Sequence, residues 1–253
     1  QQEWDSPWGN GFPGWHIECS AMSSKYLGNQ FDIHTGGEDH IPVHHTNEIA
    51  QSENSFNKKP WVRYWLHGSF LRFFGEKMSK SKGKIATISN LEEQGYSALD
   101  FRYFILTAHY RKQLNFSRDG MDMAKKSRER LKNIISMIDD DGKINSKYLK
   151  DFEKVIDEDL DMPMALSVLW KMVRDPKAES KIRTIKEMDK VFGLDLLKKE
   201  EVEIPVEVKK LVEEREEARK NKNWKLSDEL REKILKKGYK VDDTNNGSNI
   251  QKI

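Results

Sequence analysis

The stretch FDIHTGGED, residues 31–39, decides the fold of this chain. Its first four residues are typical of a short strand, which is predicted to end at Gly36 and Gly37. Glycines let a ligand approach the backbone closely, and ligands of open α/β sheets bind at such strand ends. The carboxylate of Asp39 could hold an ammonium group there. An ordinary strand-to-helix turn capped by Asp39 is an equally supported alternative.

Two zones surround and follow this stretch. Residues 1–86 combine Gly-rich turns with short apolar runs and a helix expected near residues 43–55, which together form an α/β pattern. Residues 87–200 predict a helical bundle that begins at a capping box of Ser89 and Glu92. One of its apolar stripes consists of Met123, Leu131, Ile134, Ile135 and Ile138.

A third zone, residues 201–253, predicts a small separate mixed α/β unit. Pro205 starts a charged helix, and Asn221–Asn223 interrupt it. A second helix begins at Trp224 and ends at Gly238, a common C-terminal cap. The whole chain is therefore predicted to be α/β in its first part and mainly helical after it.

Composition narrows the classes of protein. The net charge of the 253 residues is only +2, so a nucleic-acid surface must come from local clustering of charge. The single cysteine, Cys19, excludes an intramolecular disulfide and fits a reducing, cytoplasmic location. No run approaches the ~20 apolar residues that span a bilayer, so we expect no membrane association.

Cys19, His44 and Glu48 are the first candidates for chemistry. His44 and Glu48 are four residues apart, so they share one face of a helix. A thiolate, an imidazole and a carboxylate suit Zn²⁺, and three ligands indicate an open site or a missing fourth ligand. Two alternatives remain: Cys19 as a small buried apolar residue, and His45 in place of His44.

A second candidate is the segment KMSKSKGK, residues 77–84, which holds four lysines, two serines and one glycine. Lysine ammonium groups, hydroxyls and backbone N–H groups around Gly83 could bind a triphosphate. A solvated basic turn has the same composition and is the commoner case.

Together these segments resemble cysteinyl-tRNA synthetases of class I. Residues 77–81 spell KMSKS, the second signature of that class, and residues 14–22, GWHIECSAM, are similar to the zinc-cysteine segment of the family. Residues 31–39 and 44–52, followed by residues 102–115, continue the similarity in register.

The resemblance implies ATP-dependent ligation of L-cysteine to its cognate tRNA through cysteinyl-adenylate. It implies that Cys19, His44 and Glu48 are three of four ligands of a Zn²⁺ that selects the substrate thiol. It further implies that Trp15 and His34 line the cysteine pocket and that Asp39 lies near the substrate ammonium.

The same resemblance implies an ATP site, with Mg²⁺ accompanying the nucleotide. His34, Gly36 and Gly37 would contact ATP, and Lys80 would bind its phosphates. Lys77 and Lys80 would stabilise charge on the leaving pyrophosphate.

The resemblance extends to tRNA recognition. Residues 1–86 would be the C-terminal half of the catalytic domain, residues 87–200 the stem-contact fold and bundle, and residues 201–253 the anticodon-recognition domain. The anticodon contacts would be made by Arg219, Trp224 and Asp243, although Trp224 could instead be a core anchor between two helices. We expect a monomer whose partners are cysteine tRNA, L-cysteine and ATP.

Several positions depart from the family pattern. The HIGH motif and the first zinc cysteine of the family would lie upstream of Gln1, so we expect this fragment alone to be inactive. Thr35 stands where a third glycine is usual, Lys84 where Asn is usual, and Ile250-Gln251 where a Trp-Arg pair is typical. Two alternatives remain: the non-catalytic tRNA-binding half of a split or degenerate synthetase, and a cysteine ligase of mycothiol biosynthesis.

Overall fold

A computed structural model describes residues 3–73, 76–77, 87–198, 205–244 and 247–252. Lys80 and the rest of residues 78–86 lie outside this range, so the predicted phosphate loop is not part of the description. Lys77 and Asp243 are described by their backbone only, the first in a strand beside the loop and the second in a strand of the C-terminal unit.

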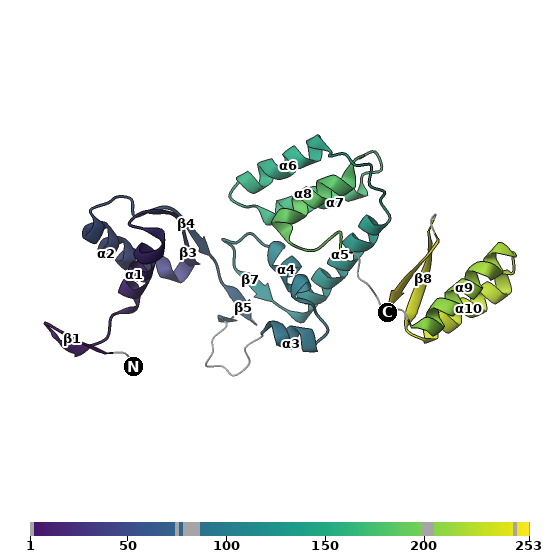
Figure 1. Cartoon of the computed structure of the whole chain (residues 1–253), viewed down its shortest axis with the longest axis horizontal. Helices are drawn as coiled ribbons and strands as arrows, with labels where there is room; N and C mark the ends of the chain where they lie inside the picture. Colours follow the sequence, from purple (N-terminus) through teal and green to yellow (C-terminus); the bar gives the residue numbers. More distant parts are fainter. Residues whose placement is uncertain (1–2, 74–75, 78–86, 199–204, 245–246, 253) are drawn as a thin grey trace.

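The N-terminal unit is built on a pair of parallel strands, which confirms the predicted α/β class. Strand β3 pairs in parallel with β4, from Phe31 opposite Val62 to Gly37 opposite Gly68. Helices α1 and α2 contact each other beside these strands (Figure 1). The elements of this unit are β1 (Trp4–Ser6), β2 (Gly9–Gly11), α1 (Trp15–Leu27), β3 (Phe31–Gly37), η1 (Glu38–His40), η2 (Ile41–His45), α2 (Thr46–Phe56) and β4 (Val62–Gly68).

The middle unit joins a small sheet to six helices. Strand β5 pairs antiparallel with β6 and parallel with β7, so the strand order is β6-β5-β7. Because β5 precedes residue 86 and β7 follows it, this sheet crosses the boundary expected from the sequence. The elements are β5 (Leu71–Phe73), β6 (Glu76–Lys77), α3 (Ile88–Glu93), α4 (Ala98–Leu106), β7 (Leu114–Phe116), α5 (Arg118–Ser136), α6 (Ser146–Asp157), α7 (Met162–Arg174) and α8 (Lys181–Phe192).

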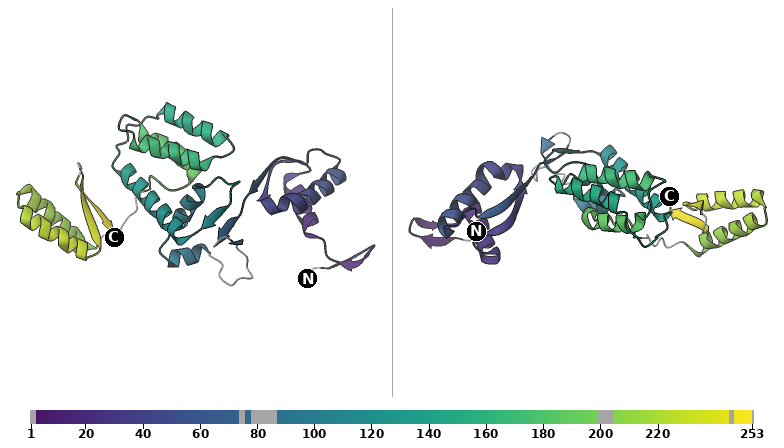
Figure 2. Two further views of the ribbon diagram at one scale, coloured as in Figure 1. Left: turned by 180° about the vertical axis from the view of Figure 1, so that it is seen from behind. Right: turned by 90° about the horizontal axis from the view of Figure 1, so that it is seen from above.

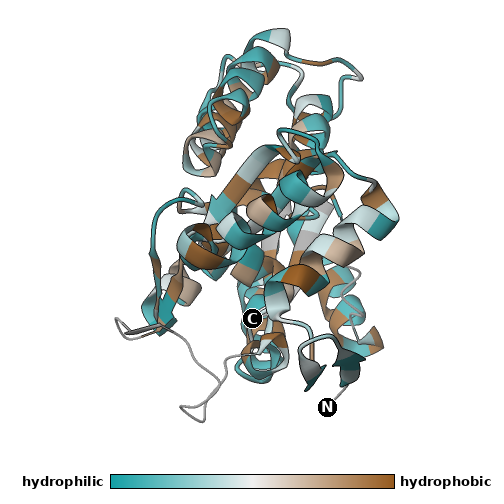
Figure 3. Ribbon diagram, turned by 90° about the vertical axis from the view of Figure 1, so that its left-hand side faces the viewer, coloured by the Kyte–Doolittle hydropathy of each residue, from teal (hydrophilic) through white to brown (hydrophobic). Residues whose placement is uncertain are grey.

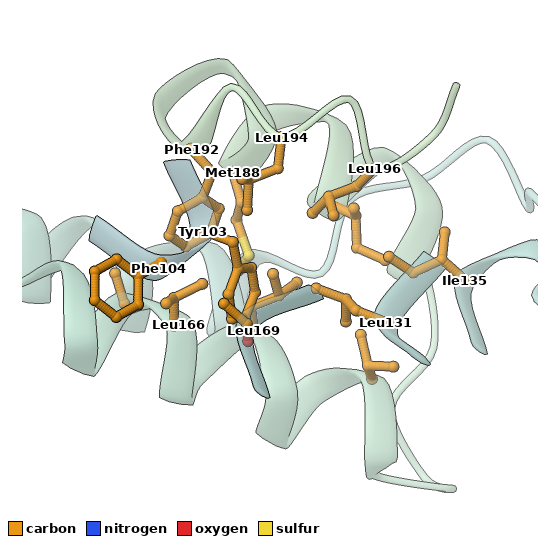
Figure 4. Packing of buried hydrophobic residues seen from close by; sticks show 14 of the residues in the cluster. Tyr103, Phe104, Leu131, Ile135, Leu166, Leu169, Met188, Phe192, Leu194 and Leu196 are labelled. Carbon is orange, nitrogen blue, oxygen red and sulfur yellow. The ribbon is translucent and has the colours of Figure 1, made fainter. Parts of the chain in front are cut away.

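The helices of the middle unit enclose the larger of the two hydrophobic cores among the described residues. Tyr103 and Phe104 from α4, Leu131 from α5 and Leu169 from α7 meet there (Figure 4). A buried ion pair crosses the same region, with Arg128 Nε 2.7 Å from Asp100 Oδ1. Such a pair fixes the register of α5 against α4, because either charge alone would be buried without compensation.

Two local predictions for this unit are wrong. Helix α3 is capped by Thr87 and Asn90, whose side chains and backbone N–H groups pair reciprocally, and not by Ser89 and Glu92. On α5 the buried methionine is Met121, which is fully buried, whereas Met123 is 65% exposed.

The C-terminal unit is a helical hairpin packed on a β-hairpin. Its elements are α9 (Val206–Lys220), α10 (Trp224–Lys236), β8 (Tyr239–Thr244) and β9 (Gly247–Lys252). A small core joins them through Val208, Val212, Ile234, Tyr239 and Val241. The predicted helix boundaries are confirmed, and Gly238 has φ +82°, a conformation that favours glycine.

The three units follow one another along the long axis of the molecule. Both views in Figure 2 place α9 and α10 at the opposite end from the N-terminal unit. Within the described ranges, no helix combines the length and apolar character needed to cross a membrane.

Candidate metal centre and substrate site

The structure brings Cys19, His44 and Glu48 together. Cys19 lies on α1, while His44 is the last residue but one of η2 and Glu48 lies in the first turn of α2. The four-residue spacing directs His44 and Glu48 to one side, and the contact of α1 with α2 adds the thiol. One ligand atom from each residue lies within 4.8 Å of the other two.

The centre of the cluster is a buried carboxylate. Glu48 is 0% exposed, and its Oε2 lies 3.2 Å from His34 Nε2, 3.6 Å from His44 Nε2 and 3.8 Å from His45 Nε2. Burial lowers the pKa of His44, and it lowers the pKa of His45 to about 4, with help from the neighbouring imidazoles. These two rings are therefore neutral near pH 7 and do not compensate the charge of the Glu48 carboxylate. A divalent cation would supply that compensation.

The thiol responds to the same surroundings. Burial raises the pKa of Cys19, and the carboxylates of Glu48 and Glu18 raise it further. A bound cation reverses this preference, because it stabilises the thiolate that would ligate it. The set of one sulfur, one imidazole nitrogen and one carboxylate oxygen thus fits zinc in its chemistry.

Two other groups of donors overlap this one. The first is His40, His44 and His45, and the second is His34, His45 and Glu48. His45, the alternative ligand, occurs in both but not with Cys19. Because a soft thiolate favours zinc, the group that contains Cys19, with His44 and not His45, is the better candidate.

Gly36 lies directly against His45. A Cβ atom at Gly36 would be 2.4 Å from Cε1 of His45 and 2.8 Å from Nδ1 of His40. The space at this glycine therefore receives imidazole rings of the cluster.

Gly36→Ala is expected to destabilise the fold by about 1–3 kcal/mol, the usual cost of overpacking, because the buried ring of His45 and the half-buried ring of His40 must shift. Urea unfolding measures this cost. Gly68→Ala is the matched control, because a Cβ there meets nothing within 4 Å. Equal stability of the two variants would show that the rings move freely.

The predicted cysteine-pocket residues lie at the edge of the cluster. The Trp15 ring stacks on His44 with centroids 4.0 Å apart and stays 55% exposed. His34 stacks on Trp65 at 4.8 Å and approaches Glu48 with Nε2. Asp39 lies in η1, exposed and two residues after the end of β3. Because Trp15 is exposed, solvent reaches the cluster of histidines on the side of this ring.

Three histidines of the cluster were not predicted from the sequence: His40, which belongs to one donor group, and His16 and His67, which contact its members. His16 Nδ1 lies 2.7 Å from His44 Nδ1, and His67 Nε2 lies 2.8 Å from His45 Nδ1. A signal was present, because six of the seven histidines occur within the first 67 residues. That clustering does not indicate which rings meet.

The predicted anticodon residues lie in the C-terminal unit. The guanidinium of Arg219, near the end of α9, lies 5.7 Å from the ring centroid of Trp224, the first residue of α10. Trp224 is 57% exposed, so the alternative that it anchors a core is wrong. Asp243 belongs to β8.

Comparisons with known proteins agree with this fold. The model of the tRNA synthetases class I (C) catalytic domain matches residues 1–126, and that of the cysteinyl-tRNA ligase anticodon binding domain matches residues 201–249. A solved LeuRS chain from Agrobacterium radiobacter K84, in a ternary complex with tRNA and LeuAMS, has TM-score 0.51 and 13% identity. It covers 76% of this chain and 32% of its own length, and it supports the fold alone.

Curated relatives specify the family. Cysteine–tRNA ligase 1 of Burkholderia lata is 44% identical over 99% of this chain and 54% of its own length. The cysteine–tRNA ligase of Treponema denticola is 43% identical over 95% of this chain and 56% of its own length. This chain thus spans about half the length of the relatives it matches.

Fold, catalytic-domain match and relatives together define a class I aminoacyl-tRNA synthetase. Within that class, the chain belongs to the cysteine–tRNA ligase family.

Proposed function

We propose that this chain carries the thiol-selecting and tRNA-binding parts of an enzyme that ligates L-cysteine to its cognate tRNA. The observation that carries this proposal is the convergence of Cys19 and His44 on the fully buried carboxylate of Glu48. Zinc bound there would offer a coordination position to the substrate thiol, which the hydroxyl of serine fills poorly. Selection by coordination would supply specificity without an editing site.

The chain's own residues would orient the amino acid beside this centre. The exposed face of Trp15 and the imidazole of His34 would bound the side chain of cysteine, and the carboxylate of Asp39 would pair with its ammonium group. This placement would hold the cysteine carboxylate toward the end of β3, where Gly36 and Gly37 lie.

The nucleotide would be bound next to the carboxylate of the amino acid. ATP would enter with Mg²⁺, and its phosphates would be held by the KMSKS segment. Lys77 and Lys80 would stabilise charge on pyrophosphate as the cysteine carboxylate forms the adenylate. A terminal ribose hydroxyl of the tRNA would then attack the carbonyl carbon of the adenylate, forming an ester with cysteine and releasing AMP.

The tRNA would lie along the three units. Residues 1–86 would form part of the catalytic domain, residues 87–200 would contact the stem, and residues 201–253 would read the anticodon through Arg219, Trp224 and Asp243. We propose a cytoplasmic monomer, with the elongated order of the units matching an extended ligand (Figure 2).

Exposed apolar side chains on the N-terminal unit bear on the activity of this chain by itself. Ile33 of β3 and Tyr64 of β4 are 59% and 65% exposed, and Trp8 is 92% exposed. Figure 3, which faces this unit, shows hydrophobic positions on its outer helices. Parallel strands are normally covered on both faces, so we infer that further polypeptide covers this side in the active enzyme.

The chain alone is therefore expected to lack cysteine-dependent ATP–pyrophosphate exchange while still binding zinc and tRNA. An exchange assay on the 253 residues tests this, with the full-length Burkholderia lata relative as the positive control. Cysteine-dependent turnover by the chain alone would contradict it.

Measurements on the same chain distinguish the proposed ligase from the two alternative functions. A purely tRNA-binding half would bind cysteine tRNA but not zinc, whereas zinc retention supports the ligase. A ligase of mycothiol biosynthesis would need no anticodon domain, so the match over residues 201–249 favours the tRNA enzyme. Comparing tRNA with an amino sugar as the acceptor would decide between them.

A further inference from the structure

A hydrogen bond joins His44 of the candidate metal centre to a second imidazole, that of His16. His16 Nδ1 and His44 Nδ1 are 2.7 Å apart, and the rings are tilted by 48°. Both belong to one aromatic cluster, because Trp15 stacks on His44 and on His16. The pair joins the first turn of α1 to the last residues of η2. Helix α1 also supplies Cys19, and η2 supplies His44 itself.

The chemistry of imidazole restricts what this contact can be. A neutral ring has one N–H and one lone pair, so one Nδ1 donates and the other accepts. With Nδ1 occupied by His16, the free nitrogen of His44 is Nε2, which lies 3.6 Å from Glu48 Oε2 on the side of the donor group.

Only one tautomer of His44 can ligate through Nε2. The proton must be on Nδ1, and that N–H must find an acceptor, as it does for most metal-bound histidines. His16 Nδ1 is at hydrogen-bonding distance for this purpose, and the His16 proton is then on its Nε2.

We propose that His16 is a positioning residue of the metal centre. By accepting the hydrogen bond of His44 Nδ1–H, it holds His44 in the tautomer and orientation that present Nε2 to a metal shared with Cys19 and Glu48. This inference rests on the proposed zinc site, but the hydrogen bond belongs to the chain itself and can be measured without metal.

The test compares three variants of the full chain by zinc competition with a chromophoric chelator. His16→Leu removes the acceptor, and its dissociation constant for zinc should rise about 10–100-fold, the usual effect of losing such a partner. His16→Asn places an amide oxygen where Nδ1 was, and it should remain close to the unsubstituted chain.

His67→Leu is the matched control. His67 bonds His45 Nδ1 at 2.8 Å in the same manner, but His45 is not in the donor group with Cys19. It should also remain close to the unsubstituted chain. Equal weakening by His16→Leu and His67→Leu would mean a general packing effect and would overturn the proposal.

A second readout is the tautomer of His44, from ¹⁵N–¹H NMR of the imidazole ring in the metal-free chain. The proton is expected on Nδ1, and His16→Leu should give a mixture of tautomers. A proton on Nε2 of His44 in the unsubstituted chain would overturn the proposal, even if His16→Leu fails to fold. Absence of zinc binding by the unsubstituted chain, with the proton still on Nδ1, would instead count against the proposed zinc function.

Discussion

Cys19→Ser is expected to weaken zinc binding by more than about 100-fold, since loss of a mere outer partner already costs 10–100-fold. The substitution preserves size and polarity but replaces a thiolate ligand with a hydroxyl that zinc binds poorly. Cys19 is partly buried on α1, and it is the only sulfur in the Cys19–His44–Glu48 group. Chelator competition measures the affinity, and circular dichroism confirms the fold.

Glu18→Gln is the control for this variant. Glu18 is exposed, neighbours Cys19 in sequence and raises the pKa of its thiol. Removing its charge should leave zinc affinity unchanged or slightly higher. Unchanged affinity in Cys19→Ser would show that the metal is held by a group without the thiol, such as His34, His45 and Glu48.

Local chemistry explains why part of this centre could be predicted. His44 and Glu48 are four residues apart, so a helix alone brings them to one face. The partners of the outer histidines cannot be inferred this way. His16 and His44 are 28 residues apart, and His45 and His67 are 22 apart, so both contacts depend on how α1, η2 and β4 pack.

The same division applies to the fold. Pro205 and Gly238 mark helix ends through their own backbone preferences, and both boundaries were predicted. The pairing of β5 with β7, such as Phe73 opposite Phe116, joins distant segments and left no local signal. At α3 the predicted cap, Ser89, lies inside the helix, and Thr87 caps it instead because the backbone of Thr87 is extended as a cap requires.

Trp224→Ala is expected to weaken binding of cysteine tRNA by about 1–3 kcal/mol, the usual contribution of a base stacked on an aromatic side chain. The ring is 57% exposed, with the Arg219 guanidinium 5.7 Å from its centroid. It can therefore receive an unpaired base on its surface, while the cation adds attraction for the phosphates nearby. Filter binding to a cysteine tRNA transcript at fixed salt measures the loss.

Leu235→Ala is the matched control, because Leu235 is 53% exposed on the same helix, α10, but has no π face. Both variants should keep the thermal stability of the chain, since neither side chain belongs to the small core. Equal loss of tRNA affinity in both would indicate a general effect of the apolar surface. No loss in Trp224→Ala would place anticodon recognition elsewhere, whereas a loss that disappears with a transcript altered in its anticodon would assign the stacked base to the anticodon itself.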